Sequence, residues 1–231
     1  MEIFQYFVPL ITLIVLEVIL GIDNIIFISI LADKLPPEKR NKLRLWGIGL
    51  AMVMRLLLLT VIAWIMKLVV PIFTVLDNEI SGKDLILLFG GIFLIYKSTK
   101  EIYEKTEDQA HDLPNAPKKA TFKRLLIEVL ILDLVFSLDS IITAVGMVDQ
   151  LWIMYTAVVV TVIIMLFASK PITEFISKHP SFKILALCFL MVIGVSLIAE
   201  GLDYTIPKAF IYLPMAFAFI VDLIQMKTVK K

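Results

Sequence analysis

The most constraining feature of this sequence is a series of long apolar stretches. A helix needs roughly 20 predominantly apolar residues to cross the hydrocarbon core of a bilayer. The 231-residue chain contains seven such stretches, at 6–30, 44–70, 84–103, 124–148, 151–174, 182–201 and 208–227. Continuous apolar runs favour helices over the alternating pattern of membrane strands. The sequence therefore predicts an all-α polytopic membrane protein with seven transmembrane helices.

Composition excludes several other classes of protein. Hydrophobic residues make up 60% of the chain and charged residues 19%, whereas a soluble domain is about 45–50% apolar. A water-soluble enzyme is thus excluded. The net charge of +1 gives no indication of a nucleic-acid partner, and the single Cys188 allows neither an internal disulfide nor a thiolate metal cluster.

Lysine and arginine residues predict the orientation of the chain. Apart from Arg55, eighteen of them lie in the first, third and fifth connections and the C-terminal tail, whereas only Lys67, Lys83 and Lys208 lie on the opposite side. Cytoplasmic connections of membrane proteins are enriched in basic residues. We therefore expect the N-terminus outside and the C-terminus in the cytoplasm.

The hydrophilic stretch at 104–123 divides the apolar segments into three before it and four after it. Two prolines and mixed charges in this stretch favour a solvated cytoplasmic linker. We interpret residues 1–231 as a single integral membrane domain. It would contain a three-helix repeat at 6–103, a second three-helix repeat at 124–201 and an additional helix at 208–227.

The repeat is recognised from two acidic motifs. Residues 16–27 read LEVILGIDNIIF and residues 132–143 read LDLVFSLDSIIT, an offset of 116. In this alignment Glu17 corresponds to Asp133, Asp23 to Asp139, and Asn24 to Ser140, so two acids and a short polar residue recur at the same spacing. The two copies are separated by an odd number of helices and must enter the membrane from opposite sides. An inverted 3+3 repeat of this kind is common among transporters that bind substrate near the bilayer midplane.

Four acids within apolar spans need a compensating interaction. An ionised carboxylate at the bilayer centre costs about 2.5–3.5 kcal/mol on insertion scales. Arg55 is the only basic residue well inside a predicted span, and we expect it to balance part of this charge. The predicted ligands Glu17, Asp23, Asn24, Asp133, Asp139 and Ser140 all offer oxygen, which favours a hard divalent cation such as Mn²⁺, Mg²⁺ or Ca²⁺.

Helical geometry complicates this predicted site. Acids six residues apart point about 120° away from each other on a straight helix, so Glu17 and Asp23 would not face the same ion. Local unwinding near Gly21 would redirect Asp23, as in the broken helices of transporters. Ser137 stands at the equivalent position of the second copy.

The chain resembles the TerC family of integral membrane proteins. The stretches EVILGIDNIIFISILADKLP, DLVFSLDSIITAVGM and ASKPITEFISKHPSFKILALCFLMVIGVSLIAEGLDYTIPKAFIYLPMAFAF carry the resemblance, which covers nearly the whole chain apart from the linker. It implies a bacterial inner-membrane protein of the lysine-exporter-like superfamily of inverted-repeat transporters. Some members of the family are linked to Mn²⁺ export and to metal supply for secreted proteins.

We therefore expect an exporter of a divalent metal cation, with Mn²⁺ as substrate, no prosthetic cofactor and exchange for protons. The alternative is a non-transporting membrane partner of the secretion or metal-resistance machinery, in which the acids are structural. An intramembrane enzyme is ranked below both, because the sequence contains no HExxH motif and no nucleophile near the acids. The expected partners are lipid and metal ion, and a homo-oligomer or a secretion-machinery partner stays open.

Overall fold

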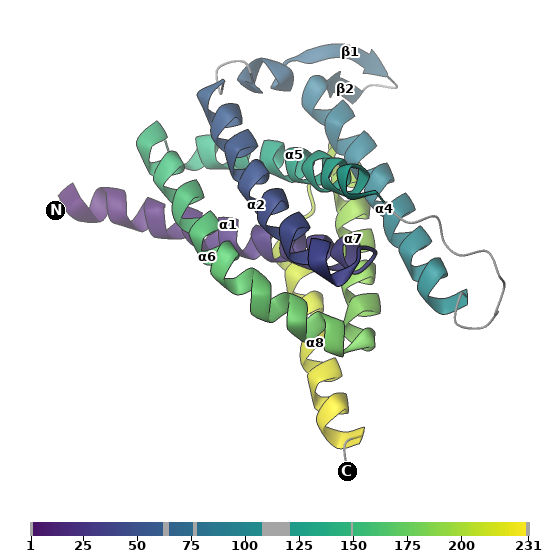
Figure 1. Ribbon diagram of the computed structural model, residues 1–231. Helices are drawn as coiled ribbons and strands as arrows, with labels where there is room; N and C mark the ends of the chain where they lie inside the picture. The colour runs from purple at the N-terminus through teal and green to yellow at the C-terminus, as the bar shows by residue number, and fades with distance from the viewer. Residues whose placement is uncertain (1, 62–64, 76–77, 108–120, 149, 230–231) are drawn as a thin grey trace. The chain divides into compact units, whose positions relative to one another are not determined.

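The computed structural model describes residues 2–61, 65–75, 78–107, 121–148 and 150–229. Within these residues the chain forms seven long α-helices, as the sequence predicts (Figure 1). They are α1 (Glu2–Ala32), α2 (Pro37–Thr60), α4 (Gly82–Glu107), α5 (Phe122–Met147), α6 (Leu151–Lys178), α7 (Pro180–Glu200) and α8 (Ala209–Val229). Most of the predicted linker lies outside the described residues.

Five of these helices are long and apolar enough to cross a membrane. They are Tyr6–Ala32 of α1, all of α2, α6 and α7, and Ala209–Met226 of α8. The remaining predicted spans form α4 and α5, which also exceed 25 residues but carry several charged side chains. At 1.5 Å per residue, α1 is about 46 Å long, more than the roughly 30 Å of the hydrocarbon core, so a tilted orientation is expected.

The region after α2 differs from the sequence prediction, which extended the second span to residue 70. The helix ends at Thr60, and a short 3₁₀ helix, η1 (Met66–Val69), leads into an antiparallel hairpin of β1 (Pro71–Val75) and β2 (Asn78–Ser81). Pro71 cannot continue a helix without losing a backbone hydrogen bond. Among the described residues of the run 61–70, Met66–Val69 form a 3₁₀ helix rather than a continuation of α2.

Local sequence explains where several helices begin. Pro37 occupies the first turn of α2 and Pro180 that of α7, where the absent N–H costs nothing. At the start of α4, the Asp84 backbone N–H donates to Ser81 Oγ (3.3 Å), and the Ser81 backbone N–H donates to Asp84 Oδ2 (2.8 Å). This reciprocal pair is a capping box, which stabilises the first turn by satisfying otherwise unpaired N–H groups.

The structure separates into two compact units, each built from both halves of the chain. Unit 1 contains residues 1–70 and 118–175, and unit 2 contains residues 71–117 and 176–231. Unit 1 thus comprises α1, α2, α5 and most of α6, whereas unit 2 comprises the hairpin, α4, α7 and α8. The predicted division into two sequence repeats stays a prediction.

Within unit 1, α1 and α6 run in the same direction. The Tyr6 and Trp152 rings lie 5.9 Å apart near the helix starts, and the Ser29 and Thr173 hydroxyl oxygens lie 2.7 Å apart near the helix ends. α2 and α5 are also parallel to each other. Gly47 approaches Val129 early in both helices, and eight residues later in each helix Arg55 contacts Ser137. These directions agree with the alternation that the predicted spans require.

Within unit 2, α4 and α7 pack closely and run antiparallel. A β-carbon added at Gly91 would lie 2.5 Å from the Gly194 carbonyl oxygen, and one added at Gly194 would lie 2.9 Å from the Gly91 carbonyl oxygen. Lys83 forms an ion pair with Glu200 at 3.1 Å near one end of this helix pair. Small residues at such a crossing allow two backbones to approach each other.

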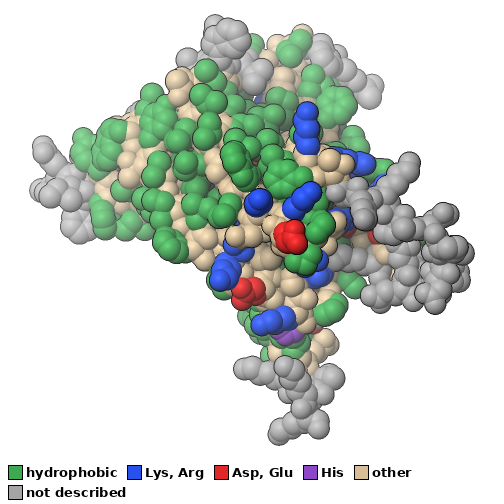
Figure 2. Space-filling model, in the orientation of Figure 1, with side chains coloured by type: hydrophobic (Ala, Val, Ile, Leu, Met, Phe, Trp, Pro, Cys, Tyr) green, Lys and Arg blue, Asp and Glu red, His purple; other side chains and the backbone are tan. Residues whose placement is uncertain are grey.

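The surface of the protein is strongly apolar. Figure 2 shows hydrophobic side chains spread widely over the face in view. Large residues such as Phe167 (80% exposed) and Phe210 (72%) point outward from α6 and α8. A surface of this kind is unfavourable in water and is expected where lipid is the solvent.

Candidate functional site: a buried ion-pair network

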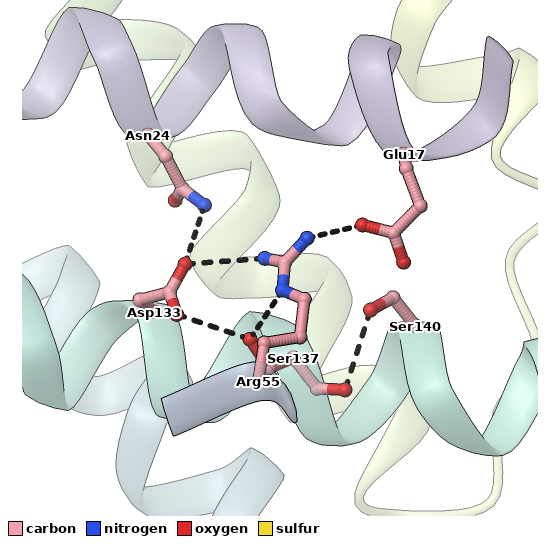
Figure 3. Close-up of polar contacts among 6 residues, drawn as sticks. All are labelled: Glu17, Asn24, Arg55, Asp133, Ser137 and Ser140. Atoms are coloured by element: carbon pink, nitrogen blue, oxygen red, sulfur yellow. Dashed lines mark hydrogen bonds and ion pairs between the residues drawn. The ribbon is translucent and has the colours of Figure 1, made fainter. Parts of the chain in front are cut away.

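The candidate site is centred on Arg55 of α2, whose side chain lies inside unit 1 and is only 4% exposed. Its guanidinium donates hydrogen bonds to groups on two other helices (Figure 3). Nη2 binds Asp133 Oδ1 of α5 at 3.1 Å, Nε binds Ser137 Oγ at 3.0 Å, and Nη1 binds Glu17 Oε2 of α1. One cation thus joins two acids that the sequence repeat aligns with each other.

Asp133 has further polar partners besides Arg55. Asn24 Nδ2 of α1 donates to Asp133 Oδ1 at 3.1 Å, and Ser137 Oγ donates to Asp133 Oδ2 at 3.1 Å. Ser137 lies one helical turn after Asp133, so both side chains are on the same face of α5. Its hydroxyl accepts from Arg55 and donates to the acid. The acid is therefore oriented by α1, α2 and α5 together.

The network contains one arginine for two carboxylates, and all three side chains are almost fully buried. A planar guanidinium can direct several N–H groups to separate acceptors, which suits Arg55 to this bridging position. Breaking a buried ion pair by removing one partner is strongly destabilising. The arrangement consequently holds three helices together and also retains an excess of negative charge.

The other predicted ligands lie nearby in sequence but differ in their contacts. Ser140 Oγ donates to the Ser137 backbone carbonyl at 3.3 Å. Asp23 and Asp139 are each only 7% exposed. Asp23 makes no hydrogen bond or ion pair with any residue that the structure describes. An isolated buried carboxylate of this kind is energetically costly and is a candidate for a functional role.

The predicted unwinding near Gly21 is not observed. Both α1 and α5 are continuous helices through their acidic motifs. Gly21 instead makes room for Met165 of α6, whose Sδ would lie 2.6 Å from a β-carbon added at position 21. Glu17 and Asp23 therefore keep different directions on α1, as a straight helix requires.

The six predicted ligands do not all converge on one point. Among the described residues, no three His, Cys, Asp or Glu side chains are close enough to hold a single ion. Glu17, Asn24 and Asp133 belong to the Arg55 network, whereas Asp23 has no polar contact with this network among the described residues. Ser137 is the contributor that sequence reasoning did not assign to the site. Its spacing of four residues from Asp133 was the available signal.

The fold and site define a polytopic helical membrane protein with a buried, charged centre. The sequence model described as "Integral membrane protein TerC family" matches residues 4–230. The chain therefore belongs to the TerC family of integral membrane proteins.

Curated relatives agree with this assignment. The chain is 51% identical to a UPF0053 protein of Haemophilus influenzae over 223 residues, covering 96% of this chain and 94% of the relative. It is also 51% identical to the UPF0053 inner membrane protein YoaE of Escherichia coli K12, covering 93% of this chain and 41% of YoaE. For YegH of the same organism the identity is 48%, covering 94% and 41%. The chain thus spans about two fifths of YoaE and YegH, and no solved structure matches it.

Proposed function

We propose that this chain forms a transporter that exports a divalent metal cation, with Mn²⁺ as the favoured substrate, from the cytoplasm. One observation carries the proposal. Glu17 and Asp133, which the acidic repeat aligns, meet at a single arginine in the interior of a membrane protein. Intramembrane acids are costly and generally mark ion or substrate pathways.

The chemistry of the surrounding groups favours a hard cation. Around Arg55 lie carboxylate, amide and hydroxyl oxygens from Glu17, Asp133, Asn24 and Ser137. Mn²⁺, Mg²⁺ and Ca²⁺ accept such oxygen ligands, whereas Zn²⁺ and Cu⁺ usually recruit imidazole or sulfur. A divalent ion that displaced the guanidinium would find two acids already close together. Exchange for protons would keep the charge of the site nearly constant.

Helix packing supports the inverted repeat on which this proposal depends. In unit 1, Ile28 of α1 lines a cavity with Val129 of α5, and Leu13 lines another with Ala144, so these repeat-related helices run antiparallel. In unit 2, Gly91 and Gly194 approach each other reciprocally where α4 crosses α7. Antiparallel pairing of equivalent helices is the arrangement that an axis in the membrane plane would produce.

We place the protein in a bacterial inner membrane with the N-terminus outside and the C-terminus in the cytoplasm. The name of YoaE describes an inner membrane protein, and basic residues are concentrated in the connections assigned to the cytoplasm. On this assignment Mn²⁺ would enter the site from the side where α1 ends and α2 begins. The chain would act as a transporter rather than as an enzyme.

A second candidate function has a specific observation in its favour. Arg55 contacts both Glu17 and Asp133, as a permanent counter-ion would. In that case the acids would join the helices of a non-transporting membrane partner of the secretion or metal-resistance machinery. The two candidates differ in whether the acids outside the Arg55 contacts, above all Asp23, are needed for metal movement.

Asp23→Asn and Asp139→Asn test the transport proposal in cells loaded with Mn²⁺. The amide keeps the side-chain volume but removes the charge that attracts a divalent ion, so each variant should abolish Mn²⁺ efflux while remaining in the membrane. Asp203→Asn is a matched control, because Asp203 is exposed and has a φ of 64°, a backbone conformation that asparagine also adopts. Wild-type efflux in both site variants would contradict the assignment of these acids.

A further inference from the structure

Unit 1 contains two small cavities, each with one acid of the Arg55 network in its lining. The Asp133 cavity is lined by Asn24, Ile28, Ile48, Val129, Asp133 and Met165, among others. The Glu17 cavity is lined by Leu13, Glu17, Leu59, Ala144, Met154 and Val158, among others. Each has a volume of about 10 Å³, close to the smallest space that holds one water molecule.

The two cavities are related by the sequence repeat. When α1 is aligned with α5 at the offset of 116 residues, three residues that line one cavity align with three residues that line the other. These pairs are Leu13 with Val129, Glu17 with Asp133, and Ile28 with Ala144. Ile48 of α2 and Val158 of α6 form a fourth pair at an offset of 110. The cavities are therefore equivalent spaces in the two halves of unit 1.

The same alignments, α1 with α5 and α2 with α6, also show where the two cavities differ in sequence. Arg55 of α2 corresponds to Met165 of α6, and Ser137 of α5 corresponds to Gly21 of α1. The residues of each half contact each other: Arg55 Nε donates to Ser137 Oγ, and Met165 Sδ lies beside Gly21. The contact between α2 and α5 thus contains the cation of Arg55, whereas the equivalent contact between α6 and α1 contains the neutral thioether of Met165.

Arg55 binds the acid of each cavity at the same time. Its guanidinium contacts Glu17 through Nη1 and Asp133 through Nη2. A cation entering either cavity would meet an acid that is already neutralised from the opposite side. Passage from one cavity to the other would require the guanidinium to release at least one of these acids.

We propose that the two cavities are the two ends of one cation pathway and that Arg55 is the barrier between them. The inference rests on the proposed function, because it assigns a route to the divalent cation. We assign the Asp133 cavity to the cytoplasmic side, since Ile28 lies four residues before the end of α1 and so near the predicted cytoplasmic connection. We assign the Glu17 cavity to the outer side, since Leu59 lies one residue before the end of α2 and Met154 three residues after the start of α6.

Thiol labelling tests the two openings separately. Ile48→Cys and Val158→Cys, each in a Cys188→Ser background, place one thiol in each cavity at equivalent positions. Right-side-out and inside-out vesicles in chloride-free buffer are treated with Ag⁺, a thiol-binding cation small enough for a space that holds one water molecule, and the thiols left unreacted are measured after denaturation. We expect Ile48→Cys to react only from the cytoplasmic side and Val158→Cys only from the external side. Reaction of both thiols from the same side, or of neither thiol, would overturn the two-ended pathway.

The barrier role is tested by repeating the labelling with Arg55→Met. Without the guanidinium each thiol should react from both sides, whereas Arg40→Met, a substitution at a half-exposed surface arginine, should leave the sidedness unchanged. Arg55→Lys serves if the methionine variant does not insert. A lysine ammonium cannot direct separate, planar N–H groups to two acids as the guanidinium does. In this variant too, each thiol should therefore react from both sides of the membrane. Retained sidedness in both Arg55 variants would overturn this role.

Metal uptake in the same vesicles separates this inference from the proposed function. Mn²⁺ uptake by a protein whose thiols lack the expected sidedness would contradict the pathway and leave metal transport standing. Strict sidedness without uptake of Mn²⁺, Mg²⁺ or Ca²⁺ would contradict the proposed function, and with it the assignment of a cation to the route.

Discussion

At the scale of single residues, Arg55 binds two acids, Glu17 and Asp133, that differ in their other polar contacts. Asp133 accepts hydrogen bonds from Arg55, Asn24 and Ser137, whereas Arg55 is the one polar partner of Glu17 among the described residues. Asp133 is therefore fixed by more hydrogen bonds than Glu17, although the two acids occupy aligned positions of the sequence repeat. Glu17 should be the acid that a competing cation releases more readily.

The Arg55→Met variant distinguishes a removable counter-ion from a permanent one. Losing the buried partner of two acids should cost about 3–5 kcal/mol, measured as a lower thermal midpoint in detergent with chelator present. If the acids bind metal, Mn²⁺ should restore much of this loss, since a ligand that binds the folded state stabilises it by an amount that grows with the logarithm of its free concentration above Kd.

Arg40→Met controls for the loss of an arginine at a site outside the network and should change the midpoint little. The metal-site reading fails if Mn²⁺ leaves the wild-type midpoint unchanged from micromolar to millimolar concentration while Arg55→Met is destabilised in every condition. That pattern would identify Arg55 as a permanent structural counter-ion.

Sequence reasoning identified Arg55 as the balancing charge because it is the only basic residue well inside a predicted span. The role of Ser137 was missed although its spacing of four residues places it on the same helix face as Asp133, and its contact with Arg55 on another helix had no signal in the sequence. The separation of Asp23 from the Arg55 contacts was not predictable either, since it depends on α1 staying straight through Gly21.

At the scale of helices and strands, hydrophobic length predicted all seven long helices that the described residues form. It placed the end of the second span at residue 70, whereas α2 ends at Thr60 and Met66–Val69 form a 3₁₀ helix. The hairpin that begins at Pro71 was not predicted. Hydrophobicity alone does not fix where a helix ends within an apolar run.

Gly91→Ala tests the packing of α4 against α7. The added β-carbon would lie 2.5 Å from the Gly194 carbonyl oxygen, a backbone atom that cannot move aside independently. We expect a loss of about 1–3 kcal/mol, as for other overpacked interiors, measured as a lower thermal midpoint. Gly49→Ala is the matched control. A β-carbon there meets nothing within 4 Å, and replacing a helical glycine should stabilise by up to about 1 kcal/mol.

Equal stability of the two glycine variants would contradict the close crossing of α4 and α7. It would also remove the reciprocal glycine contact as support for the inverted repeat. The ion-pair network in unit 1 would be unaffected, because none of its members lies in this helix pair.

At the scale of the whole molecule, the distribution of basic residues predicts one membrane orientation. A reporter inserted near Pro114, outside the described residues, or fused after Lys231 should be cytoplasmic, because the basic connections adjoin both positions. A reporter near Asn78, in the hairpin between α2 and α4, should be external. Protease accessibility in vesicles of known sidedness measures all three. An external reporter at Pro114 would contradict the orientation, and reporters near Asn78 and Pro114 on the same side would contradict the alternation that the inverted repeat requires.

The central claim is that the buried acids carry a divalent cation out of the cytoplasm. Uptake of Mn²⁺, Mg²⁺, Ca²⁺ and Zn²⁺ into inside-out vesicles containing the protein tests it most directly, with Asp23→Asn vesicles as the control. We predict saturable uptake of Mn²⁺, weaker uptake of Zn²⁺ because the site lacks sulfur and imidazole ligands, and loss of Mn²⁺ uptake in the variant. Equal, non-saturable uptake in wild-type, variant and protein-free vesicles would contradict the claim.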